Sequence, residues 1–434
     1  MNQRICRHLC IVSETYVPDV NGVANSLHRL VQHLNPKEFR VTIVRPSPRT
    51  NPNFASNETS TEKYIPVYPE LITRGFPIPQ YPEMQIGLPA GGRINKCWHQ
   101  DPPDIVYIAT EGPLGMSALR CAKALKLPVI SAFHTNFHHY SGYYGMAWIT
   151  RALMCWMRYF HNRTDRTLVP SNDVRTELTQ RGFRNVDWLP HGVDCDVFNP
   201  RWRCSVLRQS WGIPDAQQLS INPSLPTPSV LLFVGRVAAE KNLLLAIESW
   251  EKLVAAGKKV KLVVVGDGPL LATLQAKYPE IIFAGRRTGL ELSKYFASAD
   301  AFLMPSLTET FGLVTLEAMA SGLPVVAFNQ AAAAQYVRQG IDGYLCPTPS
   351  LAEKSSAVST DVSNTFHGSV CRLLENDLTL MGIDARAQAE KASWHTVARR
   401  FEHCCNELIE ERMIAPHSAA TTLSESLSES FSET

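Results

Sequence analysis

The residues that could most clearly do chemistry are four charged side chains in two short segments of the C-terminal half. Arg236 and Lys241 stand five residues apart after an apolar run. Such cations could hold phosphate oxygens, arginine through forked hydrogen bonds and lysine as a point charge. Glu309 and Glu317 are separated by seven residues, and their carboxylates could accept hydrogen bonds from sugar hydroxyls. The four residues together predict a site for an anionic ligand that carries hydroxyl groups.

Taken alone, these charged pairs also have an ordinary structural explanation. Arg236 and Lys241 could be surface charges, and Glu309 could cap the helix that follows it. Glu317 could lie on the solvated face of that helix. The surrounding elements and motifs therefore have to decide between the two explanations.

Both charged segments follow a short apolar run and lead into a helical pattern. Residues 230–235 and 301–304 are runs of the buried-strand type. Residues 243–256 and 313–321 have helical periodicity, and Gly322 is a stop signal for the second helix. Loops at the carboxyl ends of parallel strands offer free backbone N–H groups at helix N-termini, where anions are favoured. The elements thus place both charged pairs where ligands bind in α/β proteins.

The rest of the chain repeats this alternation of apolar runs and helical segments. Such alternation predicts an α/β fold with doubly wound parallel sheets. A length of 434 residues exceeds what one core usually organises, so we expect two domains of comparable size. The other predicted strands are residues 9–12, 41–44, 104–108, 128–133, 167–170, 260–265, 281–285 and 323–328, and the other predicted helices are residues 24–34, 114–125 and 171–182.

The segment with the two glutamates also carries a family resemblance. Glu309 and Glu317 enclose Phe311-Gly312-Leu313 and are followed by Ala-Met-Ala-Ser-Gly-Leu-Pro. This pattern resembles the signature of the retaining glycosyltransferases of family 4, which have the GT-B fold. The resemblance implies two Rossmann-like domains that face a central cleft, with a nucleotide-sugar held mainly by the second domain. It also implies that Glu309 and the backbone at Phe311, Gly312 and Leu313 hold the donor sugar, and that Glu317 holds the ribose.

The cations receive a role from the same resemblance. Arg236 and Lys241, which follow Gly235, are expected to clamp the donor diphosphate and to act in catalysis with Glu309. These cations would then do what a divalent ion does in other transferases. We therefore expect transfer without a metal or cofactor.

Three further residues are expected at the site. His134 ends an apolar strand, and in the resembled family a histidine at this place contacts the donor sugar or the acceptor. Gly22 matches a loop near the donor phosphates, although that family often has two glycines where this chain has Asn21-Gly22. Arg287 follows another strand and is expected beside the base or the phosphates. Taken alone, Gly22 could equally be part of an ordinary turn and His134 a structural histidine.

The expected domain organisation has five parts. Residues 1–200 would form the acceptor-binding domain and residues 230–393 the nucleotide-sugar domain. Residues 201–229 include a Pro- and Ser-rich stretch that predicts a linker. Residues 394–416 form an amphipathic helix that, by resemblance, returns to the first domain. Residues 417–434 are rich in Ser, Thr and Glu, which predicts disorder.

Composition excludes several other classes of protein. The formal net charge of +2 argues against charge-driven nucleic-acid binding. Eleven cysteines without a Cys-x-x-Cys pair fit neither a disulfide framework nor a zinc site, so reduced thiols and a cytoplasmic location are expected. No secretory signal and no bilayer-spanning run of about 18 apolar residues is evident.

One helical stretch allows two interpretations. Residues 143–162 are rich in aromatic and apolar residues with interspersed arginines. They could form a core helix with charged edges. Alternatively, they could lie in the headgroup region of an anionic membrane, which would make the protein peripheral on the inner face of the cell membrane.

The expected activity is transfer of a hexose to a lipid or glycan hydroxyl with retention of configuration. His134-Thr-Asn-Phe followed by Tyr140 is similar to family members that use GDP-mannose or make glycolipids, so mannose from GDP-mannose is the leading donor. A UDP-glucose- or other UDP-sugar-dependent enzyme that acts on diacylglycerol or a cell-envelope glycan is the second possibility. A phosphorylase or sugar-phosphate synthase of the same architecture would also fit the pattern, as would a non-catalytic nucleotide-sugar-binding protein.

Overall fold

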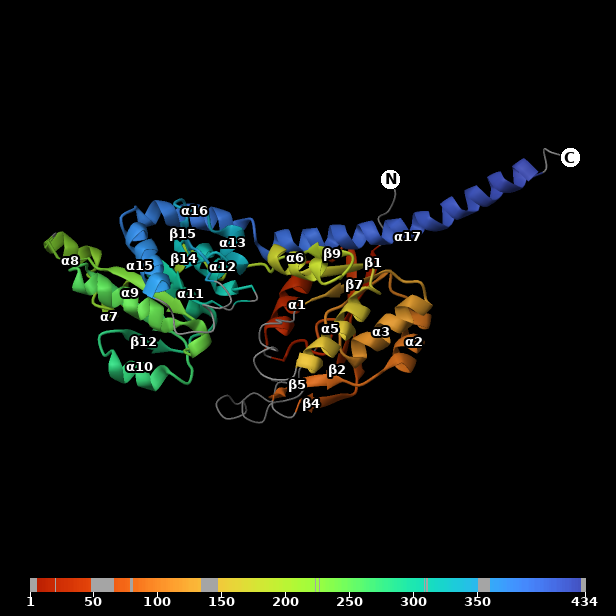
Figure 1. The fold of residues 1–434 in the computed structure, drawn as a ribbon, viewed down its shortest axis with the longest axis horizontal. Helices are drawn as coiled ribbons and strands as arrows, with labels where there is room; N and C mark the ends of the chain where they lie inside the picture. Colours follow the sequence, from red (N-terminus) through yellow and green to blue (C-terminus); the bar gives the residue numbers. More distant parts are fainter. Residues whose placement is uncertain are drawn as a thin grey trace. The chain divides into compact units, whose positions relative to one another are not determined.

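The structure is a computed structural model that divides into two compact units (Figure 1). Unit 1 comprises residues 1–190 with 394–434, and unit 2 comprises residues 191–393. The structure describes residues 6–19, 21–47, 66–78, 81–133, 147–222, 224–225, 227–307, 309, 311–349 and 360–430.

Unit 1 contains a seven-stranded parallel sheet with the order β3-β2-β1-β6-β7-β8-β9. Strand β1 pairs with β2 on one side and with β6 on the other, so Val12 lies between Val44 and Ile108. The strand order reverses between β1 and β6, the kind of position where α/β sheets bind ligands. The strands are β1 (Arg7–Val12), β2 (Phe39–Pro46), β3 (Glu70–Thr73), β6 (Ile105–Ile108), β7 (Val129–Ala132), β8 (Arg166–Val169) and β9 (Val186–Trp188).

Side-chain caps explain where two helices of unit 1 begin. Asn21 accepts a hydrogen bond from the backbone N–H of Ala24, and Ser171 accepts one from Val174, each satisfying a free donor of the first turn. An antiparallel hairpin of β4 (Gly75–Ile78) and β5 (Tyr81–Gly87) is an addition that the sequence pattern did not predict. The helices are α1 (Gly22–Gln32), α2 (Gly91–Gln100), α3 (Pro113–Ala124), α5 (Ala147–His161), α6 (Asn172–Gln180) and α17 (Trp394–Ser430).

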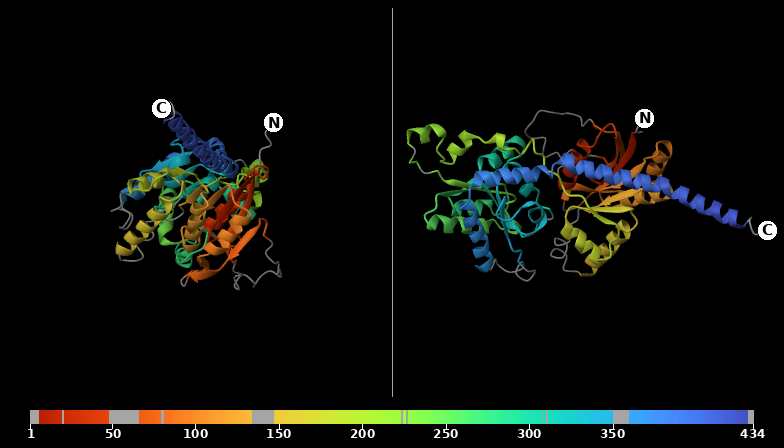
Figure 2. Two further views of the ribbon diagram at one scale, coloured as in Figure 1. Left: turned by 90° about the vertical axis from the view of Figure 1, so that its right-hand side faces the viewer. Right: turned by 90° about the horizontal axis from the view of Figure 1, so that it is seen from above.

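The C-terminal helix α17 completes the core of unit 1. Its apolar residues pack with strand residues of the sheet, and Phe401 meets Tyr107 at 4.9 Å between ring centroids. The first part of the helix runs along the same unit, and its C-terminal part extends beyond it (Figure 1; Figure 2, right). We predicted a disordered tail from residue 417, but the helix continues to Ser430, so the prediction was wrong for residues 417–430. A helix already formed over its packed part can extend without a second nucleation step.

Unit 2 contains a six-stranded parallel sheet with the order β12-β11-β10-β13-β14-β15. Its core strands are continuous apolar runs because helices cover both faces. The strands are β10 (Ser229–Val234), β11 (Val260–Val265), β12 (Ile282–Gly285), β13 (Ala301–Met304), β14 (Val325–Phe328) and β15 (Gly343–Cys346). The helices are η2 (Pro200–Trp202), α7 (Ser205–Ser210), α8 (Ala216–Ile221), η3 (Ala239–Lys241), α9 (Leu243–Ala255), α10 (Leu271–Lys277), α11 (Gly289–Ser298), α12 (Leu313–Ala320), α13 (Ala331–Tyr336), α15 (Thr360–Leu374) and α16 (Leu378–Glu390).

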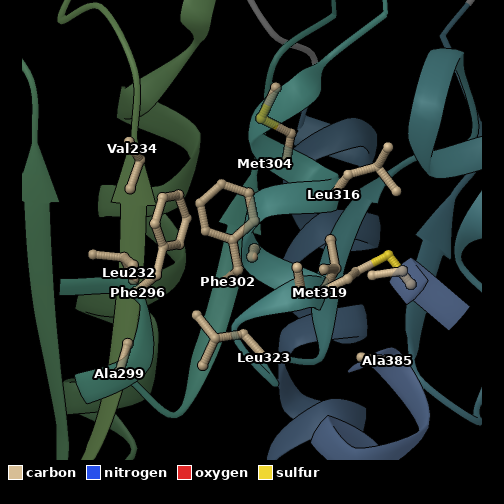
Figure 3. Packing of buried hydrophobic residues seen from close by; sticks show 14 of the residues in the cluster. Leu232, Val234, Phe296, Ala299, Phe302, Met304, Leu316, Met319, Leu323 and Ala385 are labelled. Atoms are coloured by element: carbon tan, nitrogen blue, oxygen red, sulfur yellow. The ribbon is translucent and has the colours of Figure 1, made fainter. Parts of the chain in front are cut away.

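One apolar cluster fixes helix α12 to the sheet. Phe302 of β13 packs 5.8 Å from Phe296 between ring centroids. Leu316 and Met319 of α12 belong to the same fully buried cluster, as does Ala385 of α16 (Figure 3). The backbone of α12 is thereby held rigidly at the carboxyl end of β13.

Residues 201–229 are not a linker but part of unit 2. Trp211 and Ile213 are buried in its core. Arg203 and Arg208 both donate to the carboxylate of Asp300, at 2.7 and 2.9 Å. The Pro- and Ser-rich composition concealed these anchors, and the boundary between the units lies at Pro190 rather than near residue 200.

Candidate functional site

Three glycines form a layer at the carboxyl edge of the second sheet. Gly235, Gly266 and Gly285 lie at the ends of the neighbouring strands β10, β11 and β12. The N–H of Gly235 donates to Val265 O, and the N–H of Gly266 donates to Gly285 O, both at 3.0 Å. Gly266 has a φ of +149°, and a Cβ there would lie 1.8 Å from Gly235 O. The absence of side chains therefore lets these loops pack backbone against backbone.

Arg236 follows this glycine layer and extends into solvent. Its side chain is 66% exposed, and its Nη1 lies 3.4 Å from Glu240 Oε1. An exposed ion pair of this kind is weak because water screens it. The guanidinium is thus available to an anionic ligand.

Lys241 and Glu309 form a close ion pair, although they are far apart in the sequence. The Lys241 Nζ lies 2.5 Å from Glu309 Oε1. The next residue, Asn242, has a left-handed backbone with a φ of 53°, and its side-chain amide donates to Pro305 O at 3.2 Å. These two contacts join the loop after β10 to the loop after β13. The structure therefore brings together a predicted phosphate-binding cation and a predicted sugar-binding carboxylate.

The start of α12 is held from several sides. Phe311 is buried, its carbonyl accepts a hydrogen bond of 2.7 Å from Ala332 N–H, and its ring lies 5.1 Å from that of His191. Gly312 has a φ of +80° and caps the helix without a side-chain hydrogen bond, and Leu313 is the first helical residue. The Glu309 side chain passes over Gly312, where a Cβ would lie 3.7 Å from its Cγ. A helix N-terminus without a side-chain cap is suited to bind an anion.

Glu317 lies on the next turn of α12. Burial raises the pKa of its carboxyl to about 7. Among the described residues, none donates a hydrogen bond to this carboxylate within the unit. A partly buried carboxylate without such a donor suits a group that accepts hydrogen bonds from ligand hydroxyls, which stabilise its charged form.

We expect nucleotide affinity to depend on pH through Glu317. A ligand hydroxyl that donates to the carboxylate lowers its pKa, so affinity should rise with pH up to about 7, by at most about tenfold per pH unit, and then level off. Calorimetric titration of GDP and UDP from pH 5.5 to 8 measures this dependence. Glu317→Gln is the control, because its profile retains only the titration of the phosphates; an equally steep profile in that variant would contradict the role.

No contact joins the other predicted site residues to the Lys241–Glu309 pair among the described residues, and one of them is not described. Arg287 follows β12 at the edge of the sheet and is exposed, with its guanidinium carbon 5.7 Å from the centre of the Tyr295 ring. Gly22 begins α1 in unit 1 and is exposed, with space around its Cα. His134 lies outside the described residues.

Two residues at the site were not among the predicted site residues. Asn242 and His191 support the loops that carry Lys241 and Phe311, respectively. Asparagine adopts a left-handed backbone more readily than most residues, but Asn21 before α1 is extended, so the sequence alone could not show that Asn242 is left-handed. The contact of His191 depends on the tertiary fold and has no local signal.

One sequence feature resembles a metal-binding motif. Asp194-Cys195-Asp196 has Asp-x-Asp spacing, but the Asp194 carboxylate accepts backbone N–H groups of Asp196 and Val197 at 3.1 and 3.0 Å. It thus stabilises a turn. No group of three His, Cys, Asp or Glu side chains in the described part of the chain is arranged to hold a metal ion.

The fold is shared with nucleotide-sugar enzymes of known structure. Anabaena HepE, solved in complex with UDP, matches 92% of this chain and 100% of its own with a TM-score of 0.66 at 15% sequence identity. The two units therefore have the GT-B fold of glycosyltransferases.

Sequence comparison gives the family. Residues 20–197 match Glycosyltransferase Family 4, and residues 228–361 match Glycosyl transferases group 1. The chain is 32% identical over 339 residues to a GDP-mannose-dependent alpha-mannosyltransferase of Mycobacterium tuberculosis, covering 78% of this chain and 83% of the relative. It is 28% identical over 333 residues to the alpha-monoglucosyldiacylglycerol synthase of Streptococcus pneumoniae, covering 73% and 70%. The chain belongs to this family of glycosyltransferases, as its motifs predicted.

Proposed function

We propose that the protein is a retaining hexosyltransferase that moves mannose from GDP-mannose to a hydroxyl of a lipid or glycan. The observation that carries the proposal is the arrangement at the edge of the second sheet, where Arg236, Lys241 and Glu309 lie on the loops that follow β10 and β13, next to the glycine layer. The choice of donor is supported by the relative named as a GDP-mannose-dependent enzyme.

In the proposed reaction, the bond between the anomeric carbon and the diphosphate oxygen breaks as the acceptor oxygen bonds to the same face of the sugar. The acceptor proton passes to a phosphate oxygen of the departing nucleotide, which conserves charge and atoms. Arg236 and Lys241 stabilise the negative charge that develops on the diphosphate. Fixed cations supply the electrostatic stabilisation that a divalent ion supplies elsewhere, so we propose that transfer needs no metal.

The remaining predicted residues complete the proposed site. Glu309 and the backbone from Phe311 to Leu313 hold the sugar, and Glu317 holds the ribose. Gly235 gives the phosphates close access to backbone, and Arg287 lies beside the base. For Gly22 and His134 of the first unit, a role in donor or acceptor binding stays a prediction from the family resemblance.

A panel of nucleotide-sugars tests the donor. A ligand that binds only the folded state raises the melting temperature according to its affinity, so GDP-mannose should stabilise the protein more than UDP-glucose or UDP-galactose. A larger rise in melting temperature with UDP-glucose would contradict GDP-mannose as the donor and favour UDP-glucose. That second candidate is supported by the monoglucosyldiacylglycerol synthase among the relatives.

Helix α5 supports a membrane-bound acceptor. Met157 and Phe160 on its inner face are buried, whereas Trp156 and Tyr159 are 39% and 46% exposed and stack at 6.4 Å between ring centroids. The inner face of α5 is therefore part of the core, and we propose the membrane interpretation for its exposed face only. The Trp156 indole N–H donates to Glu111 O at 3.3 Å, beyond the carboxyl end of β6. The aromatic pair is thus tied to the edge of the first sheet where ligands bind.

The charges on α5 match an anionic surface. Residues 147–161 contain Arg151 and Arg158 and no acidic residue, and Arg163 follows with its guanidinium carbon 3.8 Å from the centre of the Tyr159 ring. Exposed aromatic rings with arginines suit the headgroup region of anionic lipid. No helix in the described ranges has the length and apolar character needed to cross a bilayer. The exposed aromatic rings and the arginines of α5 lead us to propose peripheral binding at the cytoplasmic face of the membrane.

Replacing both Trp156 and Tyr159 by alanine is expected to weaken binding to vesicles that contain phosphatidylglycerol by about tenfold or more, because two interfacial aromatic anchors are lost. Co-sedimentation with these vesicles and with phosphatidylcholine vesicles measures the effect. The matched control is the double alanine variant of Leu380 and Ile383, which are 60% and 62% exposed on α16 of unit 2. Equal binding of both variants would contradict the proposed surface.

A further inference from the structure

Lys241 and Glu309 bind each other, although the proposed donor would need each side chain for a different part of the nucleotide-sugar. Lys241 is expected at the diphosphate and Glu309 at the sugar, yet without ligand the two side chains bind each other at 2.5 Å. Their side chains are only 26% and 13% exposed. Water therefore screens their mutual attraction less than it screens the exposed Arg236–Glu240 pair.

A diphosphate that approaches Lys241 also approaches the negative charge of Glu309. The lysine ammonium has three donors, but sharing it between two anions brings like charges together. The Glu309 side chain is enclosed because it passes over Gly312, and it belongs to a loop anchored through Pro305. The carboxylate is therefore poorly placed to move into water when Lys241 turns to the phosphates.

Sugar hydroxyls change this balance. Hydroxyl groups that donate to Glu309 compensate its charge after Lys241 has turned to the phosphates. A free nucleoside diphosphate brings the phosphates without those hydroxyls, so it leaves Glu309 partly buried without its counter-ion. Leaving a buried charge without a partner is costly.

We propose that Glu309 selects the nucleotide-sugar over the free nucleoside diphosphate by competing for Lys241. The carboxylate opposes a bound diphosphate unless a sugar engages it. Once the sugar has been transferred, Glu309 pairs with Lys241 again and promotes release of the nucleotide product. This inference rests on the proposed function. It concerns when Lys241 and Glu309 bind each other and when they bind the phosphates and the sugar.

The test compares the binding of GDP and UDP with that of the corresponding nucleotide-sugars, using calorimetry on the full chain. Glu309→Gln should bind GDP or UDP, whichever the wild type prefers, about tenfold more tightly than wild type does. This factor is at the lower end of the coupling energies measured for close charge pairs. The same variant should bind the nucleotide-sugar more weakly. Glu309→Ala is the second variant, and thermal melting shows that each variant is folded.

The matched control is Glu240→Gln, which removes the carboxylate beside the exposed Arg236. Because solvent screens that pair, its diphosphate affinity should stay within about twofold of wild type. Unchanged or weaker diphosphate binding in both Glu309 variants overturns the competition, even where Lys241→Ala confirms the donor site. Failure of wild type to bind GDP, UDP or any nucleotide-sugar overturns the proposed function together with this inference.

Discussion

Replacing Lys241 by alanine is expected to lower the turnover number of sugar transfer by about 100-fold or more. The ammonium group lies in the partly buried pair with Glu309, where water screens its charge weakly. The ammonium group should therefore stabilise the charge that develops on the departing diphosphate in the transition state much more than it stabilises the bound substrate. Arg236→Ala should have an effect of the same kind. Initial rates at saturating donor and acceptor measure the turnover number directly.

The matched control for this prediction is Lys294→Ala. Lys294 on α11 also forms a close ion pair, with Glu291 at 2.6 Å, but it is not part of the candidate site. Its removal should leave turnover within about twofold of wild type, as expected for an exposed pair. Turnover of Lys241→Ala and Arg236→Ala within a few-fold of wild type would remove both residues from the catalytic assignment.

Gly266→Ala is expected to lower the free energy of unfolding of unit 2 by more than about 4 kcal/mol. A loss of that size is exceptional for one substitution and indicates a specific cause, here a clash with the backbone. The added Cβ would lie 1.8 Å from Gly235 O, and a backbone carbonyl held between strands cannot rotate away as a side chain can. The φ of +149° adds strain for any residue with a Cβ. Urea unfolding followed by circular dichroism measures the loss, and donor binding should disappear with it.

Gly257→Ala separates the clash from the backbone strain. Gly257 has a φ of +75° and no atom within 4 Å of the added Cβ. Its cost should be limited to about 1–2 kcal/mol, the strain of a left-handed alanine. Equal destabilisation by the two substitutions would mean that the contact between the loops after β10 and β11 is not tight.

Much of the fold could be predicted from hydrophobic patterning. Parallel strands covered on both faces are continuous apolar runs, and this is why residues 260–265 and 301–304 were predicted with the observed bounds of β11 and β13. Capping residues were equally informative, since Ser171 begins α6 as expected. Strand β9 and the bounds and pairing of the short β3, β4 and β5 were not predicted, because brief strands carry few apolar residues.

Parts of the candidate site could not be predicted because they depend on tertiary contacts. The family signature identified Lys241 and Glu309 separately, but nothing local shows that their side chains meet across 68 positions. The Gly235–Gly266 contact likewise needs the strand order before it becomes visible. Trp211 and Arg203 were hidden in a stretch whose Pro and Ser content indicated a linker, although their anchors lie in the core and at Asp300.

The packing of α17 on the first sheet has a consequence for biosynthesis. Residues 191–393 are contiguous and contain their whole core, whereas residues 1–190 lack the apolar residues that Trp394–Ile409 supply. Translation proceeds from the N-terminus, so the half that emerges first from the ribosome stays incomplete until the final helix is released. The half that is made later can finish folding before it.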